Sequence, residues 1–444
     1  MIAAWPNVFP IEWRTIGPSD EIESARRNQQ QTSEALFSRA TRLQRQLRPE
    51  FFLRGNSKDE SVILPSMDFV VLSHLRWDFV FQRPQHLLTR CAKQNRVFFW
   101  EEPMFNSDRP RISVSNIGES LFRIVPEFPS GISPEENVRA QSELLQTFIA
   151  EREINDFVLW FYTPMALNFA RDLEPSVVVY DCMDELSAFR GAPPELRDVE
   201  SELFERANLV FVGGKTLYES KKSRHPNVHL FPSSIDRQHF AAARKSQSDP
   251  DDQAAIPHPR IGYCGVIDER LDLVLLAKVA EAKPEWQLIM VGPVAKISQE
   301  DLPKAANIHY LGGKQYSELP HYMSGWEIGM LPFALNEATK FISPTKTPEY
   351  LAAGLKVIST PITDVVHPYG ELGLAEIVNS PAEFVSAGEK LLKAESNEER
   401  KARDSSVNAF LSQNSWDLTW LKMFDLIEAI GENSSSTGME VAQQ

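Results

Sequence analysis

The chain contains 444 residues, of which 42% are hydrophobic and 24% are charged, and it carries a formal net charge of -15 at pH 7. A chain of this length is too long for one hydrophobic core, so we expect two domains with extensions. The acidic balance argues against nucleic acid as a partner, because phosphate binding requires clustered Lys and Arg.

The cysteines and the apolar segments bear on cellular location. Cys91, Cys182 and Cys264 are far apart and lack the spacing of a zinc site or a disulfide framework, which predicts buried thiols in a reducing compartment. No apolar run approaches the roughly 18 residues of a membrane span. Pro6 and Pro10 interrupt the region where a signal peptide would need an apolar core. We therefore expect a cytoplasmic protein.

Residues 1–66 form an extension that precedes the first expected strand. We expect an amphipathic helix here, whose apolar and basic faces consist of Leu36, Ala40, Leu43 and Leu47, and of Arg39, Arg42, Arg45 and Arg48, respectively. Such a helix packs on the protein's own surface or makes peripheral contact with an anionic membrane.

Residues 67–240 alternate between apolar strands and helices, which indicates an α/β domain. Strands are expected at 68–73, 96–100, 121–125, 157–162, 176–180, 209–212 and 227–231, with helices at 83–94 and 134–153. Near-continuous apolar strands of this kind form a parallel sheet covered on both faces. We expect an N-terminal Rossmann-like domain, for which the family resemblance given below implies the acceptor side.

A second α/β series follows a polar linker at 241–258. Its strands are expected at 260–265, 286–292, 307–312, 327–333 and 356–360, within a Rossmann-like domain spanning 259–414. A C-terminal helix at 415–431 would pack back on the first domain, and 432–444 would be a disordered tail. Because open α/β sheets bind ligands at the carboxyl ends of their strands, the two domains would face a central cleft.

The segment 340–360 is the expected centre of the active site. A loop with Pro344 leads into a short helix that ends at Gly354, and a β-branched strand follows. The start of a helix offers free N–H groups and a positive dipole end, which suit a phosphate. Lys346 and Glu349 share a helical face and would meet a diphosphate and a sugar diol, or else simply pair on the surface.

The residues Ser343 to Lys346, Glu349 to Gly354 and the strand after them resemble the nucleotide-sugar signature of GT-B glycosyltransferases of family 4, or group 1. The resemblance runs from about Asp68 to Leu426. It implies a nucleoside diphosphate sugar donor, no cofactor and no metal, with Glu349 on the ribose. Phe341 stands where retaining members usually carry a Glu, so retention or inversion stays open.

Several residues are candidate donor contacts on this basis. They are Gly265, Arg270, Gly292, Gly313, Lys314, Tyr316, Lys340, Ser343, Thr345, Lys346 and Glu349. The resemblance implies that the loop from Gly313 to Tyr316 reads the base through main-chain bonds, which leaves UDP, GDP, ADP and TDP unseparated, although we favour a UDP-sugar. Arg270 is an approximate match to the family pattern and has the alternative of a salt bridge with a nearby aspartate. The glycines have the alternative of being ordinary loop residues.

Two strand ends in the first domain supply candidates for the acceptor side. His74, Trp77, Gln82, Arg83 and Asp181 bring together polar and aromatic groups that suit a sugar. Asp184 is the candidate general base, with Lys346 and Arg270 as the other catalytic residues. The alternatives are that Trp77 belongs to the core, that Arg83 is a helix charge and that Asp184 caps a helix.

The combined prediction is a hexosyltransferase that moves a sugar from a nucleoside diphosphate sugar to a glycan or lipid-linked acceptor, in polysaccharide, cell-wall or glycolipid synthesis. Two alternatives remain open. One is a nucleotide-sugar epimerase of GT-B fold, and the other is a catalytically silent subunit of a polysaccharide synthase.

Overall fold

A computed structural model describes residues 67–245 and 248–441 of the chain. The chain separates into the units Met1–Pro65 and Ser66–Gln444, and the description below concerns the second. The basic amphipathic helix predicted around Leu36 to Arg48 lies outside the described residues.

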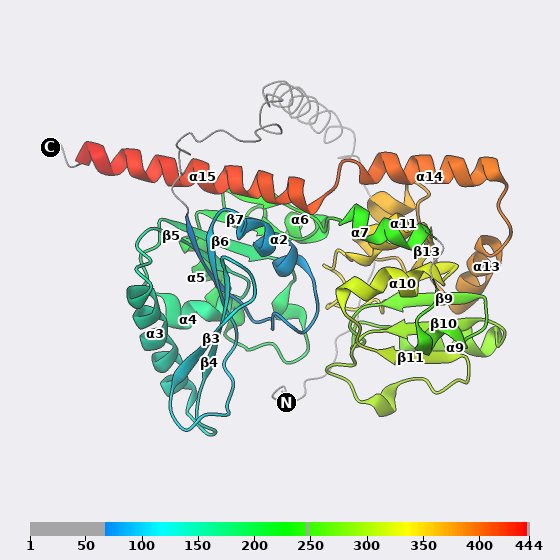
Figure 1. Ribbon diagram of the computed structural model, residues 1–444, viewed down its shortest axis with the longest axis horizontal. Coiled ribbons are helices and arrows are strands. Elements are labelled where there is room, and N and C mark those ends of the chain that lie inside the picture. Colours follow the sequence, from blue (N-terminus) through cyan, green and yellow to red (C-terminus); the bar gives the residue numbers. More distant parts are fainter. Residues whose placement is uncertain (1–66, 246–247, 442–444) are drawn as a thin grey trace. The chain divides into compact units, whose positions relative to one another are not determined.

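The first sheet has eight strands in the order β3-β4-β2-β1-β5-β6-β7-β8 (Figure 1). All neighbours are parallel except β3 and β4. Its strands are β1 (Asp68–Leu72), β2 (Arg96–Trp100), β3 (Arg111–Asn116), β4 (Leu121–Glu127), β5 (Phe157–Phe161), β6 (Val177–Cys182), β7 (Leu209–Val212) and β8 (Val228–Leu230). The predicted strands are confirmed, and β3 is an addition. Its mostly exposed side chains left no apolar run to signal a strand.

Helices cover both faces of this sheet. They are α2 (Arg83–Cys91), α3 (Pro134–Glu151), α4 (Leu167–Ala170), α5 (Leu196–Arg206) and α6 (Lys215–Lys221), with short 3-10 turns η2 (Pro164–Ala166) and η3 (Leu186–Ala188). In the sheet, β1 lies between β2 and β5. The strands that follow β1 in sequence are therefore added first on one side of it and then on the other, so the strand order reverses beside β1. Loops that leave the carboxyl ends of strands at such a point diverge and leave room for a ligand.

The second sheet has six parallel strands in the order β11-β10-β9-β12-β13-β14. They are β9 (Arg260–Cys264), β10 (Gln287–Val291), β11 (Ile308–Gly312), β12 (Ile328–Leu331), β13 (Lys356–Ser359) and β14 (Glu376–Ile377). Only the two-residue β14 was not predicted. The strand order of the second sheet reverses beside β9, so the expectation of two Rossmann-like sheets is confirmed.

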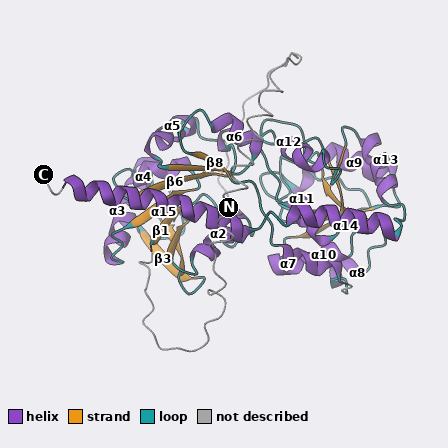
Figure 2. Cartoon of the chain, turned by 90° about the horizontal axis from the view of Figure 1, so that it is seen from above, coloured by secondary structure: helices purple, strands orange, loops and turns teal. Residues whose placement is uncertain are grey.

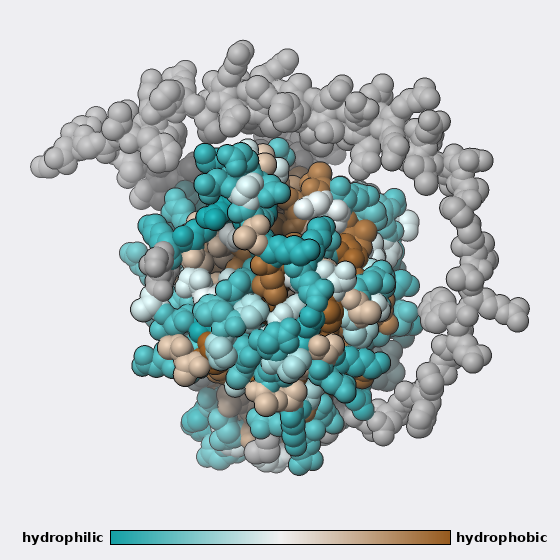
Figure 3. Space-filling view, turned by 90° about the vertical axis from the view of Figure 1, so that its right-hand side faces the viewer, coloured by the Kyte–Doolittle hydropathy of each residue, from teal (hydrophilic) through white to brown (hydrophobic). Residues whose placement is uncertain are grey.

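The elements around the second sheet complete the second half of the molecule. They are α7 (Arg237–Ala241), η4 (Ala242–Arg244), α8 (Asp251–Ala254), α9 (Leu273–Ala282), η5 (Gln299–Asp301), η6 (Tyr316–Glu318), α10 (Leu319–Ser324), α11 (Lys346–Ala353), α12 (Thr363–Val365), η7 (Val366–Gly370), α13 (Pro381–Leu391) and α14 (Asn397–Leu411). Figure 2 shows these helices on either side of the sheet. The face in Figure 3 is mostly hydrophilic, with smaller hydrophobic areas between the polar ones.

The chain crosses between the two hydrophobic cores twice. Phe231 belongs to the core of the first sheet, while Ile235 and Phe240 already belong to the core of the second. The chain returns between Leu411 and Trp416. The first crossing therefore precedes the predicted linker at 241–258.

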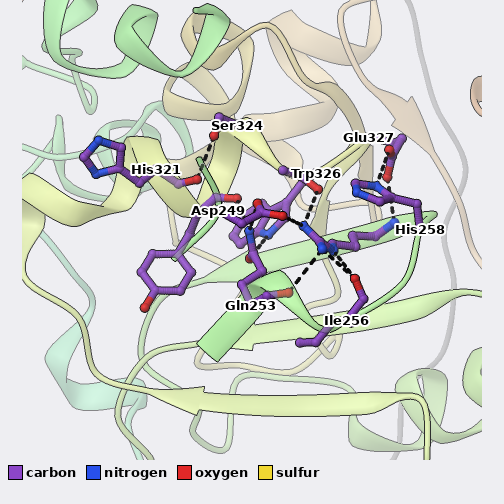
Figure 4. Close-up of polar contacts among 11 residues, drawn as sticks. Asp249, Gln253, Ile256, His258, His321, Ser324, Trp326 and Glu327 are labelled. Carbon is purple, nitrogen blue, oxygen red and sulfur yellow. Dashed lines mark hydrogen bonds and ion pairs between the residues drawn. The ribbon is translucent and has the colours of Figure 1, made fainter. Parts of the chain in front are cut away.

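That predicted linker is a packed part of the second half. Gln253 is fully buried and accepts a hydrogen bond from Trp326 Nε1 at 2.8 Å (Figure 4). Arg260, 1% exposed, donates to Asp249 Oδ2 at 2.8 Å and to the carbonyl of Ile256 from Nε at 2.9 Å. The polar composition that suggested a flexible linker instead supplies partners for a buried guanidinium.

The C-terminal helix α15 (Trp416–Val441) packs against the first sheet, as predicted. Trp416, Trp420, Met423 and Ile427 are buried in the same core as β1, and α15 runs beside α2 in Figures 1 and 2. The helix continues to Val441, so it includes most of the segment expected to be a disordered tail.

Replacing Arg260 with Met should lower the free energy of unfolding by about 3 kcal/mol, because it leaves Asp249 and two buried carbonyls without their donor. Urea titration followed by tryptophan fluorescence measures this change. Arg400→Met, at an exposed position on α14, is the matched control and should change stability by less than about 0.5 kcal/mol. Equal effects of the two substitutions would show that the Arg260 network does not stabilise the fold.

Candidate active site

A cavity of about 200 Å³ lies between loops of the two sheets and is lined from both halves. The loops that enclose it follow the carboxyl ends of strands, as the strand orders require. Eleven of the predicted site residues line it: Gln82, Arg83, Asp184, Gly265, Arg270, Gly292, Lys314, Tyr316, Ser343, Thr345 and Lys346. The predicted central cleft is therefore present.

Helix α11 presents its first turn to this cavity, and packing fixes its position. Tyr350 is fully buried, and its hydroxyl accepts a hydrogen bond from the Cys264 N–H at 2.8 Å, which ties the helix to the end of β9. At the other end, Arg244 donates to the carbonyls of Ala352 and Leu351 at 2.7 and 2.9 Å. Gly354 ends the helix with a φ of 89°, as the sequence predicted.

The start of α11 combines an uncapped helix end with a buried ion pair. No side chain caps the first turn, while Ser343 to Lys346 line the cavity. Lys346 Nζ lies 2.6 Å from Glu349 Oε2, and Glu349 is 4% exposed. Burial acts to lower the pKa of Lys346, but the opposing effects, led by the charge of Glu349 and including its hydrogen bond, together raise the pKa, so the ammonium stays charged. Lys346 lines the cavity, whereas Glu349 does not line it and is buried beside Lys346, so the pair is not on the surface.

Two glycines bring the β9 and β10 loops into close contact on the cavity wall. Gly292 has a φ of 149°, and a Cβ there would lie 1.8 Å from the carbonyl oxygen of Gly265. Gly265 has a φ of 157°. No side chain fits at Gly292 between the two loops, and the backbone of both glycines lines the cavity. Gly313, in contrast, does not line it.

The cations of the cavity are paired with carboxylates. Arg270 makes a two-pronged contact with Asp268, with Nε–Oδ1 and Nη2–Oδ2 distances of 2.9 and 2.7 Å, which is the salt-bridge alternative considered from the sequence. Lys314 Nζ lies 2.5 Å from Asp252 Oδ2. Arg270 Nη1 has no hydrogen-bond partner among residues 67–245 and 248–441, so this nitrogen remains able to bind an anion.

Arg83 and Asp181, both predicted as acceptor contacts, form a buried ion pair. Asp181 is fully buried and accepts hydrogen bonds from Arg83 Nε and Nη2 at 3.0 and 2.8 Å. Arg83 also donates to the carbonyl of Phe231 at 2.6 Å. Arg83 lines the cavity but Asp181 does not, so the carboxylate holds the guanidinium in place and does not itself face a ligand.

Asp184 faces the cavity from the loop after β6. It caps no helix, since η3 has no side-chain cap. Its carboxylate receives no hydrogen bond within the described part of the chain. Burial raises the pKa of Asp184, while the positive charges of Arg270 and Lys296 oppose the rise. The next residue, Glu185, pairs with the buried Lys221 at 2.7 Å, which anchors the loop.

Three predicted contacts lie elsewhere. The partly buried Trp77 ring packs edge-on against Phe99 at 5.1 Å, so it packs against the core, which favours the alternative. His74 does not line the cavity, and burial, with a smaller effect of Lys296, lowers its pKa to about 4. Lys340 is exposed and lies over the Phe341 ring at 5.3 Å. Apolar packing, which spacing does not reveal, decides the position of Trp77.

Other cavity residues were not predicted. Phe81, Gly213 and Ser233 line it from the first half and from the crossing segment. Gly213 and Ser233 come soon after the strands β7 and β8, so the strand-end rule that located Asp184 could have found them. Phe81 gave no such signal, because it lies nine residues after β1 in a long loop.

Asp364 joins the two halves beside the cavity. It is 6% exposed, and its carboxylate, on α12, accepts hydrogen bonds from the Lys215 and Thr216 N–H groups at 2.8 and 3.1 Å. It also accepts one from the Thr216 hydroxyl at 2.6 Å. A residue of the second half thus caps helix α6 of the first. Phe341 likewise packs against the core of the first half.

Within the described ranges, no group of three His, Cys, Asp or Glu side chains is arranged to hold a metal ion. None of the described helices is both long and apolar enough to cross a membrane.

Two Rossmann-like halves with one cavity between their strand ends define the GT-B fold. The chain matches sucrose-phosphate synthase from Thermosynechococcus elongatus with a TM-score of 0.59 and 14% identity, over 82% of this chain and 99% of that one. It matches the structure "Trehalose-6-phosphate from E. coli bound with UDP-2-fluoro glucose" with a TM-score of 0.61 and 12% identity, over the same shares. These similarities establish the fold.

A curated protein shows similarity in sequence. The chain is 28% identical over 240 residues to "Putative teichuronic acid biosynthesis glycosyltransferase TuaH" of Bacillus subtilis strain 168. The match covers 48% of this chain and 58% of that protein, so it spans little more than half of the relative's length. No protein-family model matches the chain.

Asp364→Ala should lower the free energy of unfolding by about 1 to 2 kcal/mol, the usual cost of losing a helix N-cap. Asp364→Asn is the matched control, because an amide oxygen can still accept the N–H bonds, and it should retain most of the stability. Urea titration of both variants measures the difference. If Asp364→Ala is as stable as the wild type, the cap does not hold the two halves together.

Proposed function

We propose that this chain is a glycosyltransferase that moves a sugar from a nucleoside diphosphate sugar to a hydroxyl of a glycan or lipid-linked acceptor. The observation that carries the proposal is the start of α11, where an uncapped helix end and Lys346, paired with the buried Glu349, face a cavity between two Rossmann-like halves. A helix N-terminus and a lysine suit a diphosphate. A buried carboxylate beside them suits a ribose diol.

The chemistry asked of these groups is stabilisation of a leaving group. When the acceptor oxygen attacks the anomeric carbon, the bond from that carbon to the diphosphate oxygen breaks and negative charge grows on the diphosphate. Lys346, Arg270 Nη1 and the first-turn N–H groups of α11 would meet this charge. The main-chain groups of Gly265 and Gly292 offer close approach to the same ligand.

The acceptor would enter from the first half, where Arg83, Gln82 and Asp184 line the cavity. Asp184 is our candidate for the base that takes the acceptor proton if the reaction inverts configuration. If the reaction retains configuration, the departing phosphate takes that proton. Phe341 has no carboxylate and packs against apolar residues of the first half. Its position therefore supplies no base or nucleophile to either route.

The nature of donor and acceptor is proposed from the relatives. The E. coli structure is bound with UDP-2-fluoro glucose, and the Burkholderia vietnamiensis protein with 14% identity and a TM-score of 0.59 is a UDP-forming synthase, so we favour a UDP-sugar. The relative TuaH is named for teichuronic acid biosynthesis, which favours a polysaccharide or cell-wall product. We place the reaction in the cytoplasm, with the basic segment of residues 36–48 as the candidate for contact with the membrane.

Two other functions would use the same donor site. A GT-B epimerase would isomerise the sugar without an acceptor, whereas a silent synthase subunit would neither transfer nor hydrolyse the donor. The free carboxylate of Asp184 on the acceptor side favours transfer, because an epimerase needs no group to accept an acceptor proton.

Glu349 and Lys346 should act on different kinetic constants. Glu349→Gln removes a charge-assisted bond to the ribose of roughly 1.5 to 3 kcal/mol, so the donor KM should rise about ten- to a hundredfold with kcat less affected. Lys346→Met should act mainly on kcat, because charge on the diphosphate grows in the transition state. Steady-state kinetics on both variants, with UDP, GDP, ADP and TDP sugars first screened by thermal shift, measures the split.

Lys390→Met is the control for that experiment, since it breaks an exposed ion pair with Glu376 and should leave both constants unchanged. If the Lys346–Glu349 pair is merely structural, losing it should lower the melting temperature of both variants without a donor-specific defect. Unchanged donor kinetics in Glu349→Gln would remove the centre of the proposal.

Asp184→Asn should lower turnover at saturating donor by about a hundredfold or more, with donor affinity nearly unchanged. A base works only when ionised, so wild-type activity should fall as the pH drops through the pKa of Asp184, which burial raises above the ordinary aspartate range. The remaining activity of the variant should lack this acid limb. Normal turnover in Asp184→Asn would favour proton transfer to the departing phosphate.

A further inference from the structure

Tyr316 is an aromatic residue of the cavity whose two ring faces are already covered. His239 stacks on one face with a centroid distance of 4.2 Å and an interplanar angle of 11°. Phe81, from the first half, also stacks on the Tyr316 ring, with a centroid distance of 4.4 Å and an interplanar angle of 25°. The backbone oxygen of Tyr316 also lies 2.9 Å from His239 Nε2. The ring therefore has no free face on which a nucleobase could stack, and its position is fixed on both sides.

The hydroxyl of Tyr316, unlike its ring, lacks a partner. This oxygen is buried and makes no hydrogen bond within the described residues. An unsatisfied buried polar group costs about 1 to 3 kcal/mol, so its persistence calls for an explanation. Tyr316 lines the cavity, which offers one: a bound ligand satisfies the hydroxyl.

Charge near the hydroxyl indicates what that ligand group would be. Burial raises the pKa of Tyr316, and the negative charges of Glu349 and Asp236 raise it further. The hydroxyl therefore keeps its proton and is a hydrogen-bond donor. A ribose hydroxyl can accept from a phenol and donate to a carboxylate at once, which satisfies both groups.

We infer that Tyr316 Oη donates a hydrogen bond to a ribose hydroxyl of the bound nucleotide, and that Phe81 is a positioning residue that holds the ring from the first half. The inference rests on the proposed donor site and extends it with a second ribose-binding side chain. It also makes donor affinity depend on a residue of the acceptor half.

The test is calorimetric titration of the full chain with UDP and with its 2′-deoxy and 3′-deoxy analogues. Tyr316→Phe should weaken UDP binding about five- to tenfold, the effect of one hydrogen bond. It should also reduce, by a similar factor, the preference for UDP over the deoxy analogue that lacks the contacted hydroxyl. Its melting temperature should be equal to or above that of the wild type, because the substitution removes an unsatisfied hydroxyl.

Phe81→Ala should also weaken UDP binding. Introduced into the Tyr316→Phe variant, it should weaken UDP binding much less than in the wild type, because both substitutions act through one contact. Phe79→Ala is the matched control, because Phe79 is an exposed phenylalanine of the same loop that does not line the cavity. It should leave UDP affinity unchanged.

The outcomes separate this inference from the proposal beneath it. If the wild type binds UDP and Tyr316→Phe binds it equally well, the ribose contact is wrong while the donor site stands. If Phe81→Ala and Phe79→Ala behave alike, Phe81 has no positioning role. A wild-type chain that binds none of UDP, GDP, ADP or TDP overturns the donor site itself, and the inference with it.

Discussion

The buried Lys346–Glu349 ion pair sets the main constraint on the active site. A lysine and a glutamate away from water are tolerated only in good geometry with further support, since their desolvation costs several kcal/mol. The support comes from the packing of α11: Tyr350 ties the helix to β9, and Arg244 binds its last carbonyls. The segment that looked like a linker thus helps to hold α11 in place.

Other cationic side chains of the cavity are also paired with carboxylates. Arg83 is paired with Asp181, Arg270 with Asp268 and Lys314 with Asp252. An anionic ligand would therefore meet cations whose orientation is already set, and binding would not have to order flexible side chains. Contacts between the halves, through Asp364 and through Phe81 on Tyr316, keep the two walls of the cavity together.

The correct and incorrect predictions divide along physical lines. Apolar runs such as those of β1, β9 and β10 located the strands, because a strand buried on both faces has few other compositions. The exposed edge strand β3 lacked this signal. Trp77 was assigned to the acceptor site, but its partly buried ring packs edge-on against Phe99. Composition alone does not say whether an aromatic residue next to polar ones faces a ligand or the core.

The sequence by itself determined the two α/β halves, the strand ends that meet at the cavity and the position of Lys346 and Glu349 on one helix face, because these follow from local periodicity and short spacing. Only the tertiary structure decided which cations are neutralised, that Asp364 caps a helix of the other half and that Phe81 covers Tyr316. The contacts of Asp364 and Phe81 join residues more than one hundred positions apart. Their partners are chosen by the packing of the two halves and leave no pattern along the chain.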